Sequence, residues 1–307
     1  MDERREDPSY PTLNVPILDG PQKQAYAIGE IVNQVVQGDC LKVLKKLPDA
    51  SVDLVFVDPP YYLQLPKKKL TRWEVGSVVE GVNEQWDKFE SFEEYDRFIG
   101  EMLVEIKRIM KPTATIWVIA TYHNLFRVGK IMQDLGYWIL NDIIWLKKNP
   151  MPNWLRVRFT NATETMIWAV RSKEAKGYTF HKDYARAFGV GKTGANVWVI
   201  PVCNGRERVR DEQGKRIHSA QKPVELLRRV LLTASNQGDV ILDPLAGVGT
   251  SGYVAAGLGR RPVMVEINPV YASAICERME KPAKIETGAV PHKENGTSGY
   301  LKMDRSE

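Results

Sequence analysis

Apolar runs alternate with amphipathic segments along most of the chain. Short runs rich in β-branched and aromatic residues are typical of buried strands, and they lie at 53–57, 113–120, 138–148, 164–170, 239–243 and 261–267. Segments in which apolar residues recur every three or four positions are typical of helices, and they lie at 40–47, 92–111, 125–136, 222–236, 249–259 and 269–280. This alternation predicts an α/β fold with a doubly wound, mostly parallel sheet.

The same pattern divides the chain. Pro112 is expected to end helix 92–111, and Gly136 to end helix 125–136. Residues 66–90 show no sustained period and predict a long loop. The predicted units are an N-terminal arm (1–30), a first half (31–171), a basic inserted lobe (172–217), a second half (218–282) and a disordered tail (283–307).

Composition narrows the class of protein. The 307 residues suffice for one large core with a smaller lobe. No apolar run approaches the roughly 20 residues of a membrane helix, and the charged start MDERRED does not resemble a signal peptide, so we expect a cytoplasmic protein. The scattered cysteines and histidines show no metal-ligand spacing, which predicts no metal site. The net charge of +5 permits a polyanionic partner without establishing one.

The segment DLVFVDPPYYLQ joins a predicted buried strand to an acid, two prolines and two tyrosines. Proline cannot donate to a strand ladder, so Asp58, Pro59 and Pro60 must end the strand in a stiff, extended segment. A carboxylate and the ring of Tyr61 are thereby held close together. Taken alone, the motif is equally a strand terminator or an active site.

A second motif, DVILDPLAGVGTSGYVAAGLGRRPVMVEINP, lies far downstream. The predicted strand ends at Asp243, and Gly247, Gly249 and Gly252 lie in the turn that opens a helix, where a ligand can approach the backbone. The next strand ends at Glu266, which is placed to accept hydrogen bonds from ribose hydroxyls. A dinucleotide fits less well, because Asp243 would repel its pyrophosphate and suits an ammonium or sulfonium instead.

Together the two motifs predict one crevice, because ligands bind at the carboxyl ends of parallel strands. Asp58 and a carbonyl of the Pro59–Pro60 segment could accept hydrogen bonds from an exocyclic amino group, and Tyr61 could stack on an extruded base. S-adenosylmethionine carries both a sulfonium and an ammonium. The sequence therefore predicts methyl transfer that depends on alignment and electrostatics.

These motifs resemble the amino-group DNA methyltransferases of the permuted β group, in which Asp-Pro-Pro-Tyr precedes the Gly-rich motif. The resemblance spans about residues 30–282, and the stretches NDIIWLKKNPMPN and YHNLFRVG are most similar to the cell-cycle-regulated adenine methyltransferases of GANTC sites. It implies the methyltransferase fold with a small DNA-recognition lobe, S-adenosylmethionine as cofactor and adenine N6 in double-stranded DNA as target. A homodimer and a cognate restriction endonuclease are partners that the family suggests, in a nucleoid-associated prokaryotic enzyme.

Residue by residue, the resemblance implies a catalytic motif of Asp58, Pro59, Pro60 and Tyr61. The cofactor residues that it implies are Asp39, Cys40, Asp58, His218, Gln221, Lys222, Asp243, Leu245, Gly247, Gly249, Thr250, Glu266 and Asn268. The DNA-binding residues expected in the lobe are Lys182, Arg186, Arg206, Arg208 and Arg210. Three departures stand out. Leu245 and Thr163 replace the Phe and His that are common in the family, and HSAQKP replaces the commoner His-Pro-Thr-Gln-Lys-Pro.

Several alternatives remain open from the sequence. Asp39 could simply cap the helix that follows it. Lys222 could be a solvated residue of a first helical turn, and the basic lobe an ordinary surface. Cytosine N4 methylation, amine methylation of protein or RNA, and an inactive DNA-binding relative are the competing functions.

Overall fold

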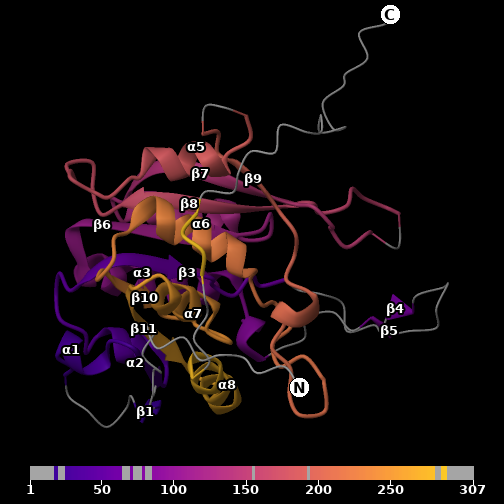
Figure 1. The fold of residues 1–307 in the computed structure, drawn as a ribbon, viewed down its shortest axis with the longest axis horizontal. Coiled ribbons are helices and arrows are strands. Elements are labelled where there is room, and N and C mark those ends of the chain that lie inside the picture. The colour runs from indigo at the N-terminus through magenta and orange to yellow at the C-terminus, as the bar shows by residue number, and fades with distance from the viewer. Residues whose placement is uncertain are drawn as a thin grey trace, which may run out of the picture.

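In the computed structural model, nine strands form one sheet in the order β1-β2-β11-β10-β3-β6-β8-β7-β9 (Figure 1). The residues that the structure describes are 17–19, 25–63, 70–71, 78–79, 85–153, 156–191, 194–280 and 285–288. Neighbouring strands of this sheet are parallel, except that β8 is antiparallel to both β6 and β7. The predicted mostly parallel α/β sheet is confirmed.

The elements follow the predicted alternation. The strands are β1 (Ile17–Asp19), β2 (Gln34–Gln37), β3 (Val52–Val57), β6 (Met110–Ala120), β7 (Trp138–Lys147), β8 (Thr163–Val170), β9 (Val197–Ile200), β10 (Val240–Asp243) and β11 (Arg261–Glu266), with a separate pair β4 (Leu70–Thr71) and β5 (Val78–Val79). The helices are α1 (Ile28–Ile31), α2 (Cys40–Leu44), α3 (Phe92–Ile109), α4 (Leu125–Asp134), α5 (Lys182–Phe188), α6 (Val224–Ala234), α7 (Thr250–Gly257) and α8 (Pro269–Met279), with 3-10 turns η1 (Gln85–Asp87) and η2 (Gly205–Glu207). Within the described ranges, no helix is long and apolar enough to cross a membrane.

Alternate side chains of the sheet face two different helical layers. In β3, Val55 and Val57 pack in the core formed with α2, α3 and α4. Leu54 and Phe56 point the other way, into the core formed with α5, α6 and α7. Because helices cover both faces, the inner strands are apolar on both sides, which is why their sequences are nearly continuous apolar runs. The sheet is doubly wound, as predicted.

The topology places a crevice between β10 and β3, which are neighbours in the sheet. From β10 the chain continues through α7 to β11 on one side, and from β3 through α3 to β6 on the other. Ligands of doubly wound sheets bind at such a reversal, outside the carboxyl ends of the strands. Since β8 runs antiparallel, its first residues lie at the same edge as the last residues of β7.

Two predicted boundaries were wrong. Helix α3 ends at Ile109 rather than at 111, because Met110 already pairs with Val52 and starts β6. Pro112 therefore lies inside the first part of a strand. The tail predicted to be disordered from 283 includes described residues 285–288, and there Ile285 is buried while Arg228 donates to the carbonyl of Glu286 at 2.7 Å.

Other strands were missed. The strand at 197–200 lies inside the predicted inserted lobe, yet it pairs in parallel with β7 and so belongs to the main sheet. The strands at 17–19 and 34–37 extend the opposite edge of the sheet, and the first of them lies in the predicted arm. All three are only three or four residues long, too short for a recognisable period. The predicted loop 66–90 contains the β4–β5 pair.

Gly252, which was predicted to lie in the turn, is the third residue of α7, and its packing leads to a stability prediction. A Cβ at Gly252 would lie 2.1 Å from Sδ of Met264, because α7 packs closely on β11 there. We expect Gly252→Ala to lower the free energy of unfolding by about 1–3 kcal/mol through overpacking. Gly29→Ala is the control, since nothing lies within 4 Å of its Cβ position. Urea denaturation compares the two variants, and equal stabilities would contradict the packing argument.

Candidate active site

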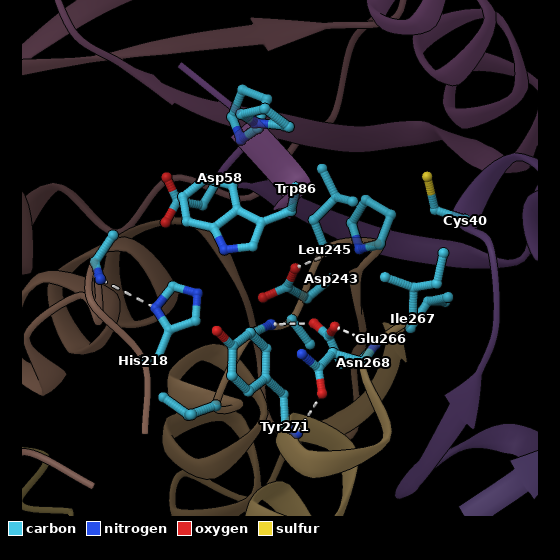
Figure 2. A pocket seen from close by; sticks show the side chains of 18 of the residues that line it. Cys40, Asp58, Trp86, His218, Asp243, Leu245, Glu266, Ile267, Asn268 and Tyr271 are labelled. Atoms are coloured by element: carbon cyan, nitrogen blue, oxygen red, sulfur yellow. Dashed lines mark hydrogen bonds between the residues drawn. The ribbon is translucent and has the colours of Figure 1, made fainter. Parts of the chain in front are cut away.

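A cavity of about 690 Å³ opens at the carboxyl edge of β2, β11, β10 and β3. Figure 2 shows Asp58, Trp86, Asp243 and Glu266 arranged around it. The lining includes every predicted cofactor residue except Gly249, together with all four residues of the predicted catalytic motif. The two sequence motifs, which are 185 residues apart at their aspartates (243 − 58), thus face one space.

The catalytic motif is tied into a network of buried charges. The hydroxyl of Tyr61 lies 2.9 Å from Oδ1 of Asp58 and 3.1 Å from Oε2 of Glu164. The ammonium of Lys222 lies 2.7 Å from Oδ2 of Asp58 and 3.9 Å from Glu164. Lys147 completes the set at 2.9 Å from Oε1 of Glu164. Two carboxylates and two ammonium groups balance, so no charge in this network is left uncompensated.

Burial raises the pKa of the Asp58 carboxyl, and the nearby ammonium of Lys222 opposes that rise. Burial also disfavours the charged form of Lys222, but Asp58 and Glu164 outweigh it and raise the pKa of the ammonium. Lys222 is therefore a charged partner of the catalytic motif rather than a solvated residue. Its ammonium also lies 5.1 Å from the centre of the Tyr61 ring, in cation–π range.

Glu164 and Lys147 were not predicted as site residues. Lys147 is the last residue of β7 and Glu164 the second of β8, so the antiparallel pairing of these strands brings both to the carboxyl edge. The available signal was an acid at the start of an otherwise apolar strand. The apolar pattern does not show the direction of that strand, and the direction decides which edge of the sheet Glu164 reaches.

The backbone of the motif is held by a second buried acid. Asp87 accepts hydrogen bonds from the N–H groups of Tyr61 and Tyr62, both at 2.7 Å, and of Leu63 at 2.9 Å. Tyr62 has a φ of 50°, a left-handed conformation that is unfavourable for a bulky residue. The three bonds to Asp87 stabilise this turn. Asp87 lies in a segment that was predicted only as part of a loop.

The carbonyl oxygen of Pro60 is already engaged. It accepts a hydrogen bond from the hydroxyl of Tyr95 at 2.8 Å and a longer one from the amide of Asn124 at 3.4 Å. Asn124 also donates to the Tyr95 hydroxyl at 3.0 Å. These two side chains come from α3 and from the start of α4, and their hydrogen bonds hold the second proline of the motif in place.

In the cofactor half, Glu266 holds the glycine turn. Its carboxylate accepts from the N–H groups of Gly247 and Asn268, each at 2.7 Å. Asp243 accepts from the N–H of Leu245 at 3.1 Å and from the hydroxyl of Ser251. Gly247 has a φ of 55°, so a side chain at this position would be strained as well as close to the neighbouring histidine.

Burial dominates the ionisation of these two acids. It raises the pKa of Asp243 to about 7, although the hydrogen bonds from Ser251 and Leu245 oppose the rise. It likewise raises the pKa of Glu266 to about 7 against its backbone hydrogen bonds. Burial also raises the pKa of Cys40 to about 12, so its thiol is neutral and unsuited to nucleophilic attack.

An aromatic stack closes one side of the cavity. The indole of Trp86 stacks on His218 with ring centres 5.6 Å apart, and Tyr271 meets the other side of that ring edge-on at 4.9 Å. Burial, with Lys222 and Arg208 nearby, lowers the pKa of His218 to about 4, so the imidazole is neutral at pH 7. Trp86 is a further lining residue that sequence reasoning missed.

Some predicted cofactor residues have structural partners of their own. Asp39 caps α2 by accepting from Leu41 N at 2.8 Å, and it also lines the cavity. The amide of Gln221 binds the backbone of Val209 and Glu207, both at 2.9 Å. The hydroxyl of Thr250 accepts a hydrogen bond from Arg278 at 2.9 Å. Gly249 is the N-cap of α7 with a φ of 69°, and a Cβ there would lie 2.9 Å from Ile275.

The predicted DNA-binding residues fall into two groups. Lys182 and Arg186 lie on α5, whose start is bonded to the end of α6 (His181 N to Thr233 O, 2.8 Å), at the amino edge of the sheet. Arg206, Arg208 and Arg210 follow β9 at the carboxyl edge. Within this second group, Arg208 binds the carbonyls of Cys203, His218 and Ser219 at 2.8–3.4 Å and braces the segment before Lys222.

Comparison with known proteins identifies the class. Residues 52–277 match the family of N6/N4 methyltransferases described as DNA methylase, and the chain belongs to this family. It is 44% identical over 254 residues to the type II methyltransferase M.HinfI of Haemophilus influenzae. The matched region covers 83% of this chain and 70% of that protein. It is 35% identical over 246 residues to the type II methyltransferase M2.DpnII of Streptococcus pneumoniae. That match covers 80% of this chain and 89% of the other protein.

Solved structures agree on the fold. The M1.HpyAVI–SAM complex is 20% identical with a TM-score of 0.58, over 80% of this chain and 98% of that one. The cytosine-N4-specific PvuII DNA methyltransferase is 18% identical with a TM-score of 0.62, over 82% and 88%. At these identities the likeness concerns the fold alone.

Replacing Asp87 tests the support of the catalytic turn. Asp87→Ala leaves three backbone N–H groups without their acceptor, and we expect the free energy of unfolding to fall by about 3 kcal/mol. Asp87→Asn retains one side-chain oxygen and should lose about half as much. Urea denaturation measures both. A loss below about 1 kcal/mol in the alanine variant would contradict the proposed support.

The raised pKa values of Asp243 and Glu266 predict a pH dependence of stability. The folded protein holds these protons more tightly than the unfolded chain, so their contribution to stability is lost as pH rises from about 4 to 7. Burial lowers the pKa of His218, so its contribution to stability changes with pH in the opposite direction. Comparison of the wild type with Asp243→Asn isolates the contribution of Asp243. In the variant, the slope of the free energy of unfolding against pH should differ from that of the wild type by up to about 1.4 kcal/mol per pH unit, because one titrating group is removed. Denaturation at pH 5, 6 and 7 measures it, and equal slopes would contradict the prediction.

Proposed function

We propose that this protein is a site-specific DNA adenine N6 methyltransferase that uses S-adenosylmethionine. The observation that carries the proposal is the meeting of Asp58 with Asp243 and Glu266 in one cavity at the topological switch point. A hydrogen-bonding carboxylate beside a tyrosine suits an extruded base. Two further buried carboxylates beside a glycine turn suit a cationic nucleoside. Membership of the DNA methylase family supports both assignments.

The residues present fit S-adenosylmethionine. Glu266 ends β11 at the cavity, where its carboxylate could hold ribose hydroxyls, and Gly247 leaves room beside the backbone. Asp243 supplies negative charge for the ammonium or sulfonium group, and Asp39 lies at the rim that suits the adenine. When bound, S-adenosylmethionine supplies an electrophilic methyl group. The solved structure of M1.HpyAVI with this compound supports the assignment by analogy of fold.

The chain's own residues would orient the amino group. Asp58 would accept a hydrogen bond from one N–H of the amino group. The carbonyl of Pro59 is the better acceptor for the other N–H, because the carbonyl of Pro60 already accepts from Tyr95 and Asn124. These two bonds favour a more tetrahedral nitrogen whose lone pair is available. Tyr61 supports the base, and its hydroxyl is fixed by Asp58 and Glu164. Such alignment contributes more than any proton transfer here.

The choice of adenine over cytosine rests on Asp58 standing where cytosine N4 enzymes of the resembled family more often have serine. Cytosine N4 methylation stays the second candidate, since a cytosine-N4-specific enzyme shares the fold. A GANTC-like site is proposed from the motif resemblance. The likeness to two type II methyltransferases supports a role in restriction–modification with a cognate endonuclease, acting on cytoplasmic DNA. A homodimer is proposed from the family alone.

For target recognition we propose the segment 204–216 rather than the whole of 172–217. Arg206 and Arg210 are exposed there, at the edge that carries the cavity. Lys182 and Arg186 lie on α5, which begins at the opposite edge, so we withdraw them from the DNA interface. Arg208 instead stabilises the segment before Lys222, because its guanidinium donates to the carbonyls of His218 and Ser219.

The test is transfer of labelled methyl groups to unmethylated double-stranded DNA, followed by nucleoside analysis. We expect N6-methyladenine from the wild type and a loss of about 10²–10³-fold in kcat for Asp58→Ala, because one transition-state hydrogen bond is removed. Asp134→Asn, an exposed acid on α4, is the control and should match wild type. N4-methylcytosine in the product would establish the alternative, and an unlabelled product would refute both.

A further inference from the structure

The connection between β7 and β8 carries three exposed apolar side chains. Met151 is 68% exposed, Val157 77% and Phe159 99%. The connection projects beyond the sheet on the right of Figure 1, the side on which β4 and β5 lie. A phenylalanine with almost no contact to its own protein is unusual, because exposure of so much apolar surface is unfavourable. It points to a partner that covers the side chain.

The charge of this connection limits what that partner can be. Arg156 and Arg158 flank Val157, and Lys148 stands at the start of the connection. Between Lys147 and Glu164 the sequence KNPMPNWLRVRFTNAT contains no acidic residue. An exposed apolar side chain beside two guanidinium groups is complementary to a polyanion with an apolar interior. Duplex DNA, with phosphates outside and stacked bases inside, has that construction.

Hydrogen bonds fix the connection next to the catalytic motif. Arg158 Nη1 donates to the hydroxyl of Tyr122 at 2.9 Å, and Asn124, two residues further on, donates to the carbonyl of Pro60. The turn itself is closed by Asn153, whose amide donates to the carbonyl of Arg158 at 2.8 Å. Phe159 therefore projects from an anchored turn.

The other end of the connection leads directly into the catalytic network. Glu164, which binds the hydroxyl of Tyr61, follows Phe159 by five residues. Five residues span at most about 18 Å when fully extended. An extruded base that reaches Tyr61 stays joined to its strand, so its gap in the duplex lies near the active site. The loop can thus reach the helix from which the base comes.

We propose that Phe159 inserts into the DNA duplex at the position vacated by the target base, while Arg156 binds an adjacent phosphate. This inference rests on the proposed DNA methylation. Insertion replaces the stacking that the extruded base loses, and it opposes return of that base to the helix. Arg158 is held by Tyr122 and positions the turn that presents Phe159.

The experiment uses the full-length protein, S-adenosylmethionine and a duplex that carries the site found by mapping methylated adenines. One version of the duplex has a normally paired target, and the other has the target opposite an abasic position, where extrusion is easier. We expect Phe159→Ala to lower kcat/KM at least tenfold on the paired duplex and to recover to within about threefold of wild type on the abasic one. Phe159→Trp should retain activity on both.

Phe180→Ala is the control, since Phe180 is 48% exposed and precedes α5 at the opposite edge of the sheet. It should match wild type on both duplexes. Wild-type activity of Phe159→Ala on the paired duplex, or an equal loss on both duplexes, would overturn the insertion. A wild-type protein that methylates neither duplex would instead overturn the proposed function.

Arg156→Gln gives an independent measurement. Loss of one phosphate contact should reduce the slope of log K against log[salt] for duplex binding by about 1, because one fewer counterion is released. Phe159→Ala should leave this slope unchanged, since an inserted ring displaces no counterion. An unchanged slope in Arg156→Gln would refute the phosphate contact.

Discussion

Compensation of buried charge governs the active site. Asp58 must remain a hydrogen-bond acceptor in surroundings that favour its neutral form, and Lys222 provides the opposing charge at 2.7 Å. The remaining protons of a buried ammonium also need acceptors nearby, and Glu164 with Lys147 completes a neutral set of four. The hydroxyl of Tyr61 lies between the same two carboxylates. Breaking any one pair would leave a charge uncompensated, so the position of Tyr61 and the ionisation of Asp58 are linked.

This network explains features of the fold that otherwise look incidental. It needs side chains from the end of β7 and the start of β8 at one edge, which only antiparallel pairing of these strands provides. It also needs the proline-rich turn to stay fixed, and Asp87 meets that need by accepting three backbone N–H groups from a turn that includes a left-handed tyrosine. Because Trp86 stacks on His218, the residue before Asp87 also contacts the cofactor side of the cavity.

The sequence predicted what depends on local pattern. The apolar runs located the inner strands. The two motifs located Asp58, Asp243 and Glu266, because each of these acids stands at the end of a strand that is recognisable from its apolar run. It did not predict β2 or β9, whose four residues are too few to show a period. Glu164, Lys147 and Asp87 were missed because their roles depend on strand direction and on contacts across 17 to 103 residues of chain. Charge along the sequence does not tell which edge of the sheet a helix reaches, so the sequence could not separate Lys182 from the arginines that follow β9.

The order of the two motifs in the chain has little physical consequence. β10 and β3 pair directly, with Ile241 opposite Leu54, although they lie far apart in sequence. The carboxyl ends of paired parallel strands coincide whichever strand comes first, so Asp58 and Asp243 meet in either order. What the order changes is the set of loops at that edge. In this chain the turn after β3 is closed by Asp87, and the connection after β7 carries the exposed side chain of Phe159, so elements that are remote from the cofactor motif in sequence stand at that edge.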